Sequence, residues 1–197
     1  MKEFWNDRYS AADYVYGKEP NEFFKSEIDK LPAGNLLLPS EGEGRNAVYA
    51  AKLSWTVDAF DQSEKGKEKC EALAKENNVT VNYTIADAVE IQLEEDKYDM
   101  IAFIFAHYPS SIRKQVHQKC IKALKPGGLL LLEAFNPLQL NNQSGGPKDI
   151  DMLYTAELLK SDFGDLNVRL LEELSTVLSE GKHHSGKGDV VRMLATK

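Results

Sequence analysis

The sequence of 197 residues contains only two cysteines, Cys70 and Cys120, and neither lies at a metal-ligand spacing. So few cysteines are typical of a reducing compartment, and we expect a cytoplasmic protein with two ordinary thiols. Long apolar runs are also missing. The longest uncharged run, Met100 to Ala106, has 7 residues, whereas a membrane span needs about 20. The N-terminus lacks a basic segment followed by an apolar one, so we expect no secretory signal and no membrane partner.

Clusters of basic side chains are missing as well. The chain has 24 Lys and Arg against 31 Asp and Glu, which gives a formal net charge of −7. Proteins that bind nucleic acids normally carry a basic patch, so we expect a small-molecule partner and no nucleic acid. With 42% hydrophobic and 28% charged residues, the chain has the composition of a globular protein, and its length is typical of one domain.

Apolar, strand-like runs alternate with longer amphipathic runs, and this alternation is typical of a parallel sheet covered by helices. Parallel strands are predicted over residues 36–39, 55–61, 79–85, 98–106 and 129–135. Helices are predicted over 44–53, over 63–76 and from Ser110 or Ser111 to Lys125, where Pro126-Gly127-Gly128 ends the last one.

The last two strand-like runs, 166–178 and 189–195, are joined by only about ten residues. A parallel crossover needs a dozen residues or more, so these runs must form an antiparallel hairpin. We therefore expect an α/β fold with a Rossmann-like, doubly wound, seven-stranded, mostly parallel sheet in three α/β/α layers. Residues 136–151 are polar and glycine-rich, which predicts a loop or lid, and a helix is predicted over 154–162.

The strongest local signal is Ser40-Glu41-Gly42-Glu43-Gly44-Arg45-Asn46, between a predicted strand and a predicted helix. Glycines allow the backbone to approach a ligand, and the helix N-terminus offers unpaired N–H groups. A tight turn that binds nothing is an equal alternative, because a lone glycine pair is weak evidence. Ala47 is an accepted substitute for the third glycine of a dinucleotide fingerprint, so the glycines alone do not exclude a nicotinamide cofactor.

Two acids follow successive predicted strands. Asp61 lies 17 residues beyond Gly44, and Asp87 stands in Ala86-Asp87-Ala88. Each acid alone is more often a helix cap or a solvated turn residue. Together, at the carboxyl edge where parallel sheets bind ligands, they outline a nucleoside site.

The ordered set of motifs resembles the class I S-adenosylmethionine-dependent methyltransferases, and among them the tellurite-resistance and thiopurine methyltransferase branch. The motifs that carry the resemblance are Phe4-Trp5-Asn6-Asp7-Arg8-Tyr9, Tyr14 to Asn21, Gly42 to Asn46, Asp61, Ala86-Asp87-Ala88, Leu124 to Gly128, Glu180-Gly181, His184, Gly186 and Val190-Val191-Arg192. The usual first motif has an acid and a further glycine where this chain has Leu38 and Ser40. Glu41 or Arg45 would then contact the amino-acid end of the cofactor.

The resemblance implies one domain over residues 1–197, with a helical cover (1–31), a cofactor-binding core (36–135), the lid (136–151) and a closing helix and hairpin (152–197). It also implies S-adenosylmethionine as the cofactor. Asp61 would take the ribose hydroxyls, and Asp87 with Ala88 would hold the adenine. The implied cofactor-binding residues are Tyr16, Gly17, Ser40, Glu41, Gly42, Gly44, Arg45, Asn46, Asp61, Gln62, Ser63, Asp87, Ala88, Phe105 and Ala106. The implied substrate-binding residues are Tyr14, His107, His183, His184 and Arg192.

The implied reaction is in-line methyl transfer to a small soft or anionic acceptor, namely a thiol or a selenium or tellurium compound. Alignment and exclusion of water supply most of the rate in such a displacement. A hydroxyl or amine acceptor would need a general base, for which His184 and His107 are the candidates. Without the resemblance, His183 and His184 would be interpreted as an exposed turn.

Two other readings stay open. Leu38 and Ser40 suggest a relative that binds S-adenosylmethionine without catalysis. A nicotinamide-dependent oxidoreductase is disfavoured because Tyr108 is followed four residues later by Ile112 and not by lysine. No Cys/His grouping has the spacing of metal ligands, so we expect no metal. The oligomeric state is not indicated.

Overall fold

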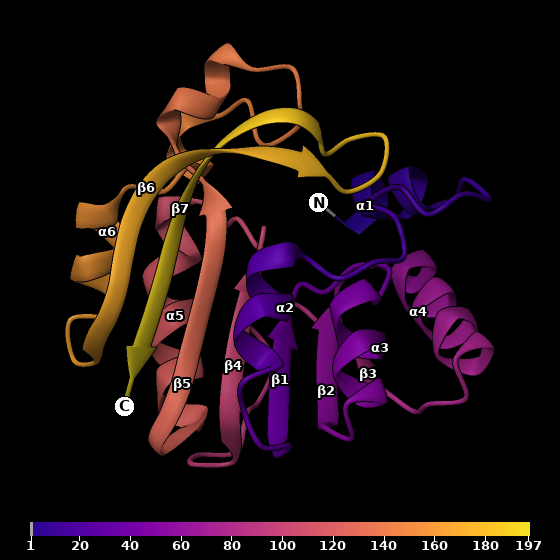
Figure 1. Cartoon of the computed structure of the whole chain (residues 1–197), viewed down its shortest axis with the longest axis horizontal. Helices are drawn as coiled ribbons and strands as arrows, with labels where there is room; N and C mark the ends of the chain where they lie inside the picture. The colour runs from indigo at the N-terminus through magenta and orange to yellow at the C-terminus, as the bar shows by residue number, and fades with distance from the viewer. Residues whose placement is uncertain (1) are drawn as a thin grey trace.

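The computed structural model describes residues 2–197, which build a seven-stranded sheet between helices (Figure 1). The strands are β1 (Asn35–Pro39), β2 (Thr56–Asp61), β3 (Asn82–Ile85), β4 (Tyr98–Ile104), β5 (Leu124–Phe135), β6 (Asn167–Ser179) and β7 (Ser185–Thr196). The α-helices are α1 (Lys2–Tyr9), α2 (Glu22–Ile28), α3 (Arg45–Lys52), α4 (Glu64–Glu76), α5 (Ser110–Ala123) and α6 (Ala156–Asp162), and two short 3₁₀ helices are η1 (Pro137–Asn141) and η2 (Ile150–Met152).

The strand order is β3-β2-β1-β4-β5-β7-β6. The first five strands pair in parallel, and β7 is antiparallel to both β5 and β6. Since β7 opposes both neighbours, β6 runs parallel to the first five strands, and the turn after it emerges at their carboxyl edge (Figure 1). The predicted α/β fold and its closing hairpin are confirmed.

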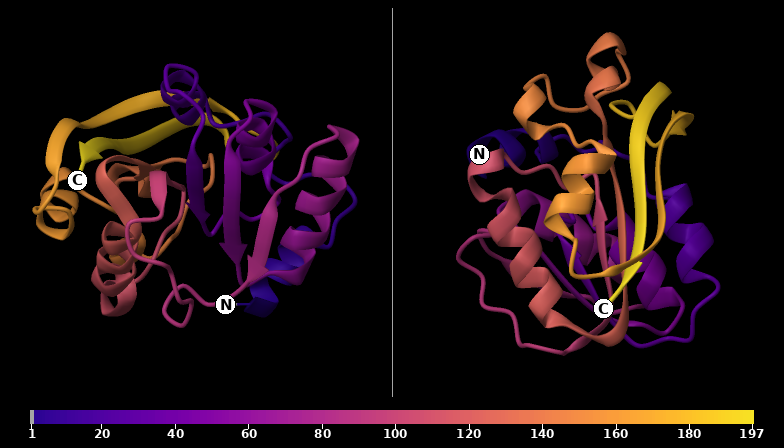
Figure 2. Two further views of the ribbon diagram at one scale, coloured as in Figure 1. Left: turned by 90° about the horizontal axis from the view of Figure 1, so that it is seen from below. Right: turned by 90° about the vertical axis from the view of Figure 1, so that its left-hand side faces the viewer.

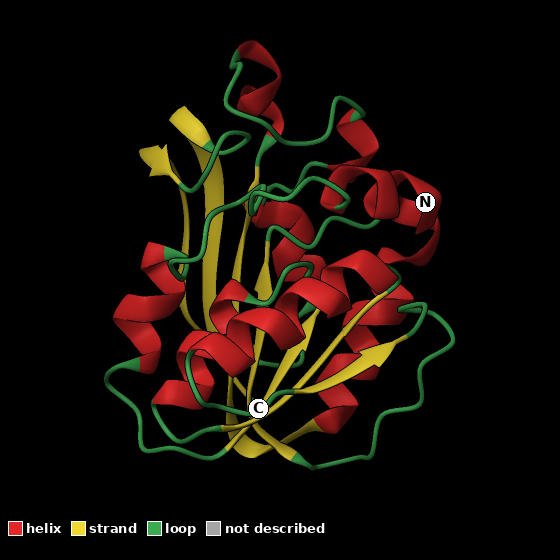
Figure 3. Cartoon of the chain, turned by 90° about the vertical axis from the view of Figure 1, so that its right-hand side faces the viewer, coloured by secondary structure: helices red, strands yellow, loops and turns green. Residues whose placement is uncertain are grey.

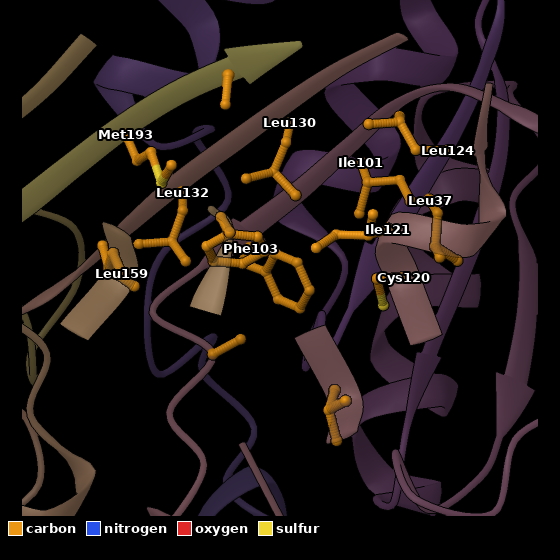
Figure 4. Close-up of a cluster of buried hydrophobic side chains, with 14 of the residues drawn as sticks. Leu37, Ile101, Phe103, Cys120, Ile121, Leu124, Leu130, Leu132, Leu159 and Met193 are labelled. Carbon is orange, nitrogen blue, oxygen red and sulfur yellow. The ribbon is translucent and has the colours of Figure 1, made fainter. Parts of the chain in front are cut away.

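Alternation along the strands divides the core between the two faces of the sheet. In β1, Leu37 packs on the face covered by α5 and α6, while Leu36 and Leu38 pack on the face covered by α2, α3 and α4. Figure 2 shows helices on both faces, and Figure 4 shows the side chains of the first cluster, among them Phe103 and Leu132. This arrangement is the expected three-layer one.

Several boundaries differ from the sequence-based expectations. Helix α5 ends at Ala123, so Lys125 and the Pro126-Gly127-Gly128 segment lie in β5 and not at a helix end. The reason is long-range pairing, because the N–H of Gly127 donates to the carbonyl oxygen of Lys197 (2.8 Å). Ser110 is the first helical residue and not a cap. Strand β3 is shorter than expected, and the turn of the hairpin spans only residues 180–184.

The segment 136–151 is less exposed than its polar composition suggests. Gln139 is fully buried: its amide Nε2 donates to Ser144 Oγ and its Oε1 accepts from the N–H of Asp189. Polar anchors of this kind allow a loop to pack without apolar side chains. The segment and α1 lie above the carboxyl ends of the strands (Figure 1), and Figure 3 shows the same arrangement from the side. Among residues 2–197, no helix is long and apolar enough to cross a membrane.

Candidate active site

A cavity of about 660 Å³ opens at the carboxyl edge of the sheet, within the size range of roughly 300–1,000 Å³ of small-molecule sites. It lies between the ends of β1, β2, β3 and β4, helix α1, lid residues 146–149 and His184. Fourteen of the implied site residues line it: Tyr16, Gly17, Ser40, Glu41, Arg45, Asn46, Asp61, Gln62, Asp87, Ala88, Phe105, Ala106, His107 and His184.

The backbone is strained where two strands run into the cavity. Ser40 follows β1 with a φ of 54°, and Phe105 follows β4 with a φ of 52°. Non-glycine residues in this region cost about 1–3 kcal/mol each, and such outliers cluster at functional sites. At Ser40, where the methyltransferases that the sequence resembles usually have a glycine, the Oγ shares a 2.8 Å hydrogen bond with the Tyr108 hydroxyl.

Asp61 is only 8% exposed and keeps room for a ligand. Its Oδ2 accepts from the N–H of Gly42 (3.1 Å), and its Oδ1 accepts from the N–H of Ser63 (2.9 Å). Burial raises the pKa of this carboxyl, and the backbone hydrogen bonds oppose the rise. Because each carboxylate oxygen can accept two hydrogen bonds, Asp61 can still accept from a hydroxyl in the cavity.

The turn after β3 presents Asp87 and Ala88. Asp87 Oδ1 accepts from the N–H of Val89 (2.7 Å), and Oδ2 accepts from the amide of Gln62. From α5, Lys119 donates to carbonyl oxygens of this turn, including that of Ala88. No acceptor within residues 2–197 takes the N–H of Ala88, so this donor is available to a ligand.

Glu41 caps helix α3. The N-cap residue Gly44 has no side chain to do so, and Glu41 Oε1 instead accepts from the N–H groups of Asn46 (2.9 Å) and Ala47 (2.8 Å). A carboxylate at this position satisfies unpaired donors and complements the helix dipole. Burial nevertheless raises the pKa of Glu41 to about 7. The chain itself thus occupies the helix terminus that the glycine turn was expected to offer to a ligand.

Six implied site residues do not line the cavity: Tyr14, Gly42, Gly44, Ser63, His183 and Arg192. Both glycines are required by packing of neighbouring helices. A Cβ at Gly42 would lie 2.6 Å from the Tyr9 hydroxyl, and one at Gly44 would lie 2.5 Å from the Cβ of Cys70. Their close approach is to α1 and α4 and not to a ligand.

The other residues of this group have structural partners or face away. Arg192 is paired with Glu133 and lies over the Phe23 ring, so it cannot neutralise an acceptor in the cavity. The Tyr14 hydroxyl donates to the carbonyl oxygen of Lys69 (2.9 Å).

The remaining two polar residues of the group lie at a helix end and in a turn. Ser63 is the N-cap of α4 and donates to Asn6 Oδ1 (2.8 Å). His183, at the tip of the hairpin turn, is exposed.

His184 faces the cavity from the hairpin turn and is 5% exposed. The centroid of its ring lies 4.5 Å from the ring centroid of Tyr16, 4.5 Å from that of Phe105 and 5.2 Å from that of Phe135. Its Nδ1 lies 3.3 Å from Glu180 Oε2. Burial lowers the pKa of His184, and the Glu180 carboxylate opposes this effect. The hydrogen bond assigns the proton to Nδ1 and leaves Nε2 as an acceptor.

His107 also lines the cavity, but both ring nitrogens are engaged. Its Nδ1 donates to the carbonyl oxygen of Met152 (2.6 Å), and its Nε2 accepts from the N–H of Phe135 (3.3 Å). Burial lowers its pKa to about 4. His107 therefore joins β5 to η2 as a neutral ring, and the geometry leaves His184 as the candidate base.

Sequence reasoning missed the aromatic face of α1. Trp5 and Tyr9, four residues apart, stack at 5.5 Å, and Arg8 lies over the Phe4 and Trp5 rings. All four line the cavity, and their helical spacing was a readable signal. Other lining residues had none, because they come from strand ends, turns, the first turn of α5 and residues 146–152: Glu43, Ala86, Val89, Ile104, Tyr108, Ile112, Phe135, Gly146, Pro147, Lys148, Asp149 and Met152.

Residues 40–128 match the model of a family described as a methyltransferase domain. Among curated proteins, ubiquinone biosynthesis O-methyltransferase of Rickettsia akari (strain Hartford) is 31% identical over 96 residues, which are 48% of this chain and 38% of that protein. The chain thus spans well under half the length of this relative.

Solved structures share the fold over most of the chain. One, concerned with the conversion of a disulfide bond into a thioacetal group during echinomycin biosynthesis, has a TM-score of 0.82 at 14% identity and covers 100% of this chain and 92% of that one. TehB from Haemophilus influenzae has a TM-score of 0.74 at 16% identity, over 100% and 66% of the two chains. A SAM-dependent methyltransferase from Aquifex aeolicus has a TM-score of 0.63 at 15% identity. The match covers 87% of this chain and 88% of that one.

At these identities the structural likeness establishes the fold, and the family match shows that residues 40–128 are similar to a methyltransferase domain. These matches agree with the expectation of an enzyme domain of the methyltransferase type that uses S-adenosylmethionine as its cofactor.

Proposed function

We propose that this chain transfers the methyl group of S-adenosylmethionine to a small acceptor held in the same cavity. One observation carries the proposal: a single cavity contains the acid at the end of β2, a free backbone donor after β3 and an imidazole with an open Nε2. In this proposal residues 1–31 form a cover, 36–135 the cofactor-binding core and 136–151 a lid over the acceptor.

The residues present fit the cofactor. Asp61 keeps acceptor positions for the ribose hydroxyls, and the free N–H of Ala88 matches an acceptor on the adenine edge. At the methionine end, Arg45 is paired with Glu180, which leaves the Ser40 hydroxyl and Arg8 as partners. Arg8 lines the cavity with no carboxylate within 4.0 Å among residues 2–197, and it donates to the Tyr16 hydroxyl (3.1 Å).

When bound, S-adenosylmethionine supplies an electrophilic methyl group, whose bond to sulfur breaks as the acceptor atom bonds to the carbon in line. The chain has to align the acceptor and exclude water. The aromatic face of α1 and lid residues 146–149 line the cavity on its outer side. His184 Nε2 takes the acceptor's proton, if the acceptor carries one.

The acceptor we propose is a small thiol, or its selenium or tellurium counterpart. Aromatic rings surround His184, and polarisable sulfur packs favourably against aromatic rings. Resemblance to the tellurite-resistance and thiopurine branch, with the shared fold of TehB, supports this class. Arg192 is paired with Glu133 outside the cavity and does not offer a positive charge to an oxyanion there. A neutral acceptor that His184 deprotonates therefore fits the cavity better than an oxyanion.

A second candidate acceptor is a hydroxyl compound. A hydroxyl has a higher pKa than a thiol and depends more on a base, which a neutral His184 supplies. The partial match to an O-methyltransferase supports this alternative.

Calorimetric titration and a transfer assay test the proposal. S-adenosylmethionine and its demethylated product are expected to bind with one-site saturation, and NAD is not. Incubation with small thiols, selenite, tellurite and small phenols is expected to give a methylated thiol. Binding of NAD in place of S-adenosylmethionine would contradict the proposal. Saturable binding without transfer to any acceptor would favour a non-catalytic relative.

A further inference from the structure

A buried carboxylate stands behind His184. Glu180, at the start of the hairpin turn, is 8% exposed. Its Oε2 accepts from Arg45 Nη2 (2.8 Å) and lies 3.3 Å from His184 Nδ1, and its Oε1 accepts from the Asn21 amide (2.9 Å). Three donors from three separate segments thus converge on one carboxylate. A buried carboxylate is costly unless its hydrogen bonds are satisfied, and here they are.

Glu180 is ionised in this setting. Burial alone would raise the pKa of the carboxyl, but the hydrogen bond from His184 and the Arg45 guanidinium lower it to about 2. An ionised carboxylate can only accept, so the hydrogen atom of the contact belongs to His184 Nδ1. A neutral imidazole carries one proton, and Nε2 is then unprotonated.

The turn that carries both residues is pinned in place. The backbone N–H of Glu180 donates to the carbonyl oxygen of His184 (2.8 Å). Gly181, with a φ of 75°, packs so closely that an added Cβ would lie 2.5 Å from the carbonyl oxygen of Val15. The turn is therefore fixed against the N-terminal cover, and the carboxylate and imidazole keep their mutual orientation.

We infer that Glu180 is a positioning residue: with Arg45 behind it, it holds His184 in the Nδ1–H form and directs the unprotonated Nε2 into the cavity as the base for the acceptor. This inference rests on the proposed function. The proton moves from the acceptor to Nε2, and the Glu180 carboxylate stabilises the imidazolium that results.

The other groups around His184 set the direction of the pH dependence. Arg45 from α3 and the neighbouring His183 lower the pKa of His184, as burial does, and only Glu180 raises it. His107 stays neutral, and burial raises the pKa of Tyr16. Removing the charge of Glu180 therefore lowers the pKa of His184 and weakens it as a base.

The tautomer can be measured without any reaction. ¹⁵N NMR of the four histidine rings, with His184 assigned through His184→Asn, is expected to show His184 protonated at Nδ1 in the unsubstituted protein. In Glu180→Gln, the amide can donate to Nδ1, and signal from the Nε2–H form is expected. His117, whose Nδ1 lies 3.0 Å from Asp162 in the core, is the internal reference and should not change. An Nε2–H form in the unsubstituted protein would overturn the inference even if the variant does not fold.

Kinetics then test the role. For an acceptor that is protonated at the assay pH, Glu180→Gln is expected to lower kcat at least tenfold, within the roughly 10²–10⁴-fold that a general base contributes. The acid limb of its pH profile should move to lower pH by about one unit or more, while affinity for S-adenosylmethionine stays the same. For an acceptor that is already ionised, kcat should change little. Equal losses with both acceptors would overturn the inference.

Glu133→Gln is the matched control. Glu133 is 1% exposed and belongs to the same polar cluster through Asn21, yet it does not contact His184. Its substitution removes the carboxylate of another buried glutamate, and the acid limb is expected to stay in place. Movement of the limb in both variants would show a general electrostatic effect and overturn the specific role of Glu180. Absence of methyl transfer by the unsubstituted protein would instead refute the proposed function. The tautomer of His184 would then still be tested by ¹⁵N NMR, which needs no reaction.

Discussion

The proposed cofactor site rests on single side chains at strand ends, and it depends most on Asp61. Asp61→Asn is expected to weaken binding of S-adenosylmethionine by about 1.5–3 kcal/mol, the usual value of a hydrogen bond to a charged group. Asp58→Asn is the control, because Asp58 lies on the same strand but pairs with Lys97 outside the cavity. Titration calorimetry on both variants decides, and equal losses of affinity would contradict the assignment.

Gly44 is a residue whose role the structure changes from ligand approach to packing. Gly44→Ala is expected to lower the free energy of unfolding more than Gly127→Ala. Both positions have positive φ, which costs about 1–2 kcal/mol with a side chain. Only at Gly44 would the new Cβ overlap Cys70, since nothing lies within 4 Å at Gly127. Urea denaturation measures the difference, and equal losses would show that the contact with α4 does not matter.

The positions of site residues were predictable where the direction of a strand alone determines them. Asp61 and Asp87 follow parallel strands, so their convergence at one edge follows from topology. Arg192 was not predictable, because its register opposite Glu133 on β5 is a long-range feature. For the same reason the sequence did not distinguish His184 from His107: their hydrogen-bond partners, Glu180 and Met152, are set by turns that have no sequence pattern.

At the scale of elements, burial of the Glu41 carboxyl that caps α3 predicts a pH-dependent stability. Its pKa in the folded protein is about 7, against an ordinary 4.5, so the folded state binds more protons than the unfolded state between these values. The free energy of unfolding should therefore fall as the pH rises through this window. In Glu41→Gln this contribution is absent. Denaturation from pH 5 to pH 8 should show a shallower fall in the variant, and parallel curves would contradict the prediction.

Element boundaries show what local pattern leaves out. Pro126-Gly127-Gly128 is a typical helix stop, yet α5 ends earlier because Leu124 already pairs with Tyr98. The segment 136–151 was expected to be a polar loop or lid, yet Gln139 is buried through hydrogen bonds to Ser144 and Asp189. Both differences come from partners distant in sequence, which no local rule detects.

At the scale of the whole molecule, the topology was predictable because connection lengths restrict it. Long crossover connections impose parallel strands, and the short last connection imposes a hairpin. The same topology brings the turn after β6 to the edge where β1 to β4 end, so residues more than 100 positions apart, such as Asp61 and His184, line one cavity. We propose that the cover, the lid and this turn determine the choice of acceptor.

Methyl transfer in a single turnover tests the central claim most directly. The protein would be loaded with S-adenosylmethionine carrying a ¹³C-labelled methyl group and mixed with a small thiol, and the label followed by NMR. We expect the label to pass to the thiol sulfur in the unsubstituted protein, and much more slowly in Asp61→Asn at subsaturating cofactor. Bound cofactor that keeps its label in the presence of thiol, selenite, tellurite and phenol acceptors would contradict the account.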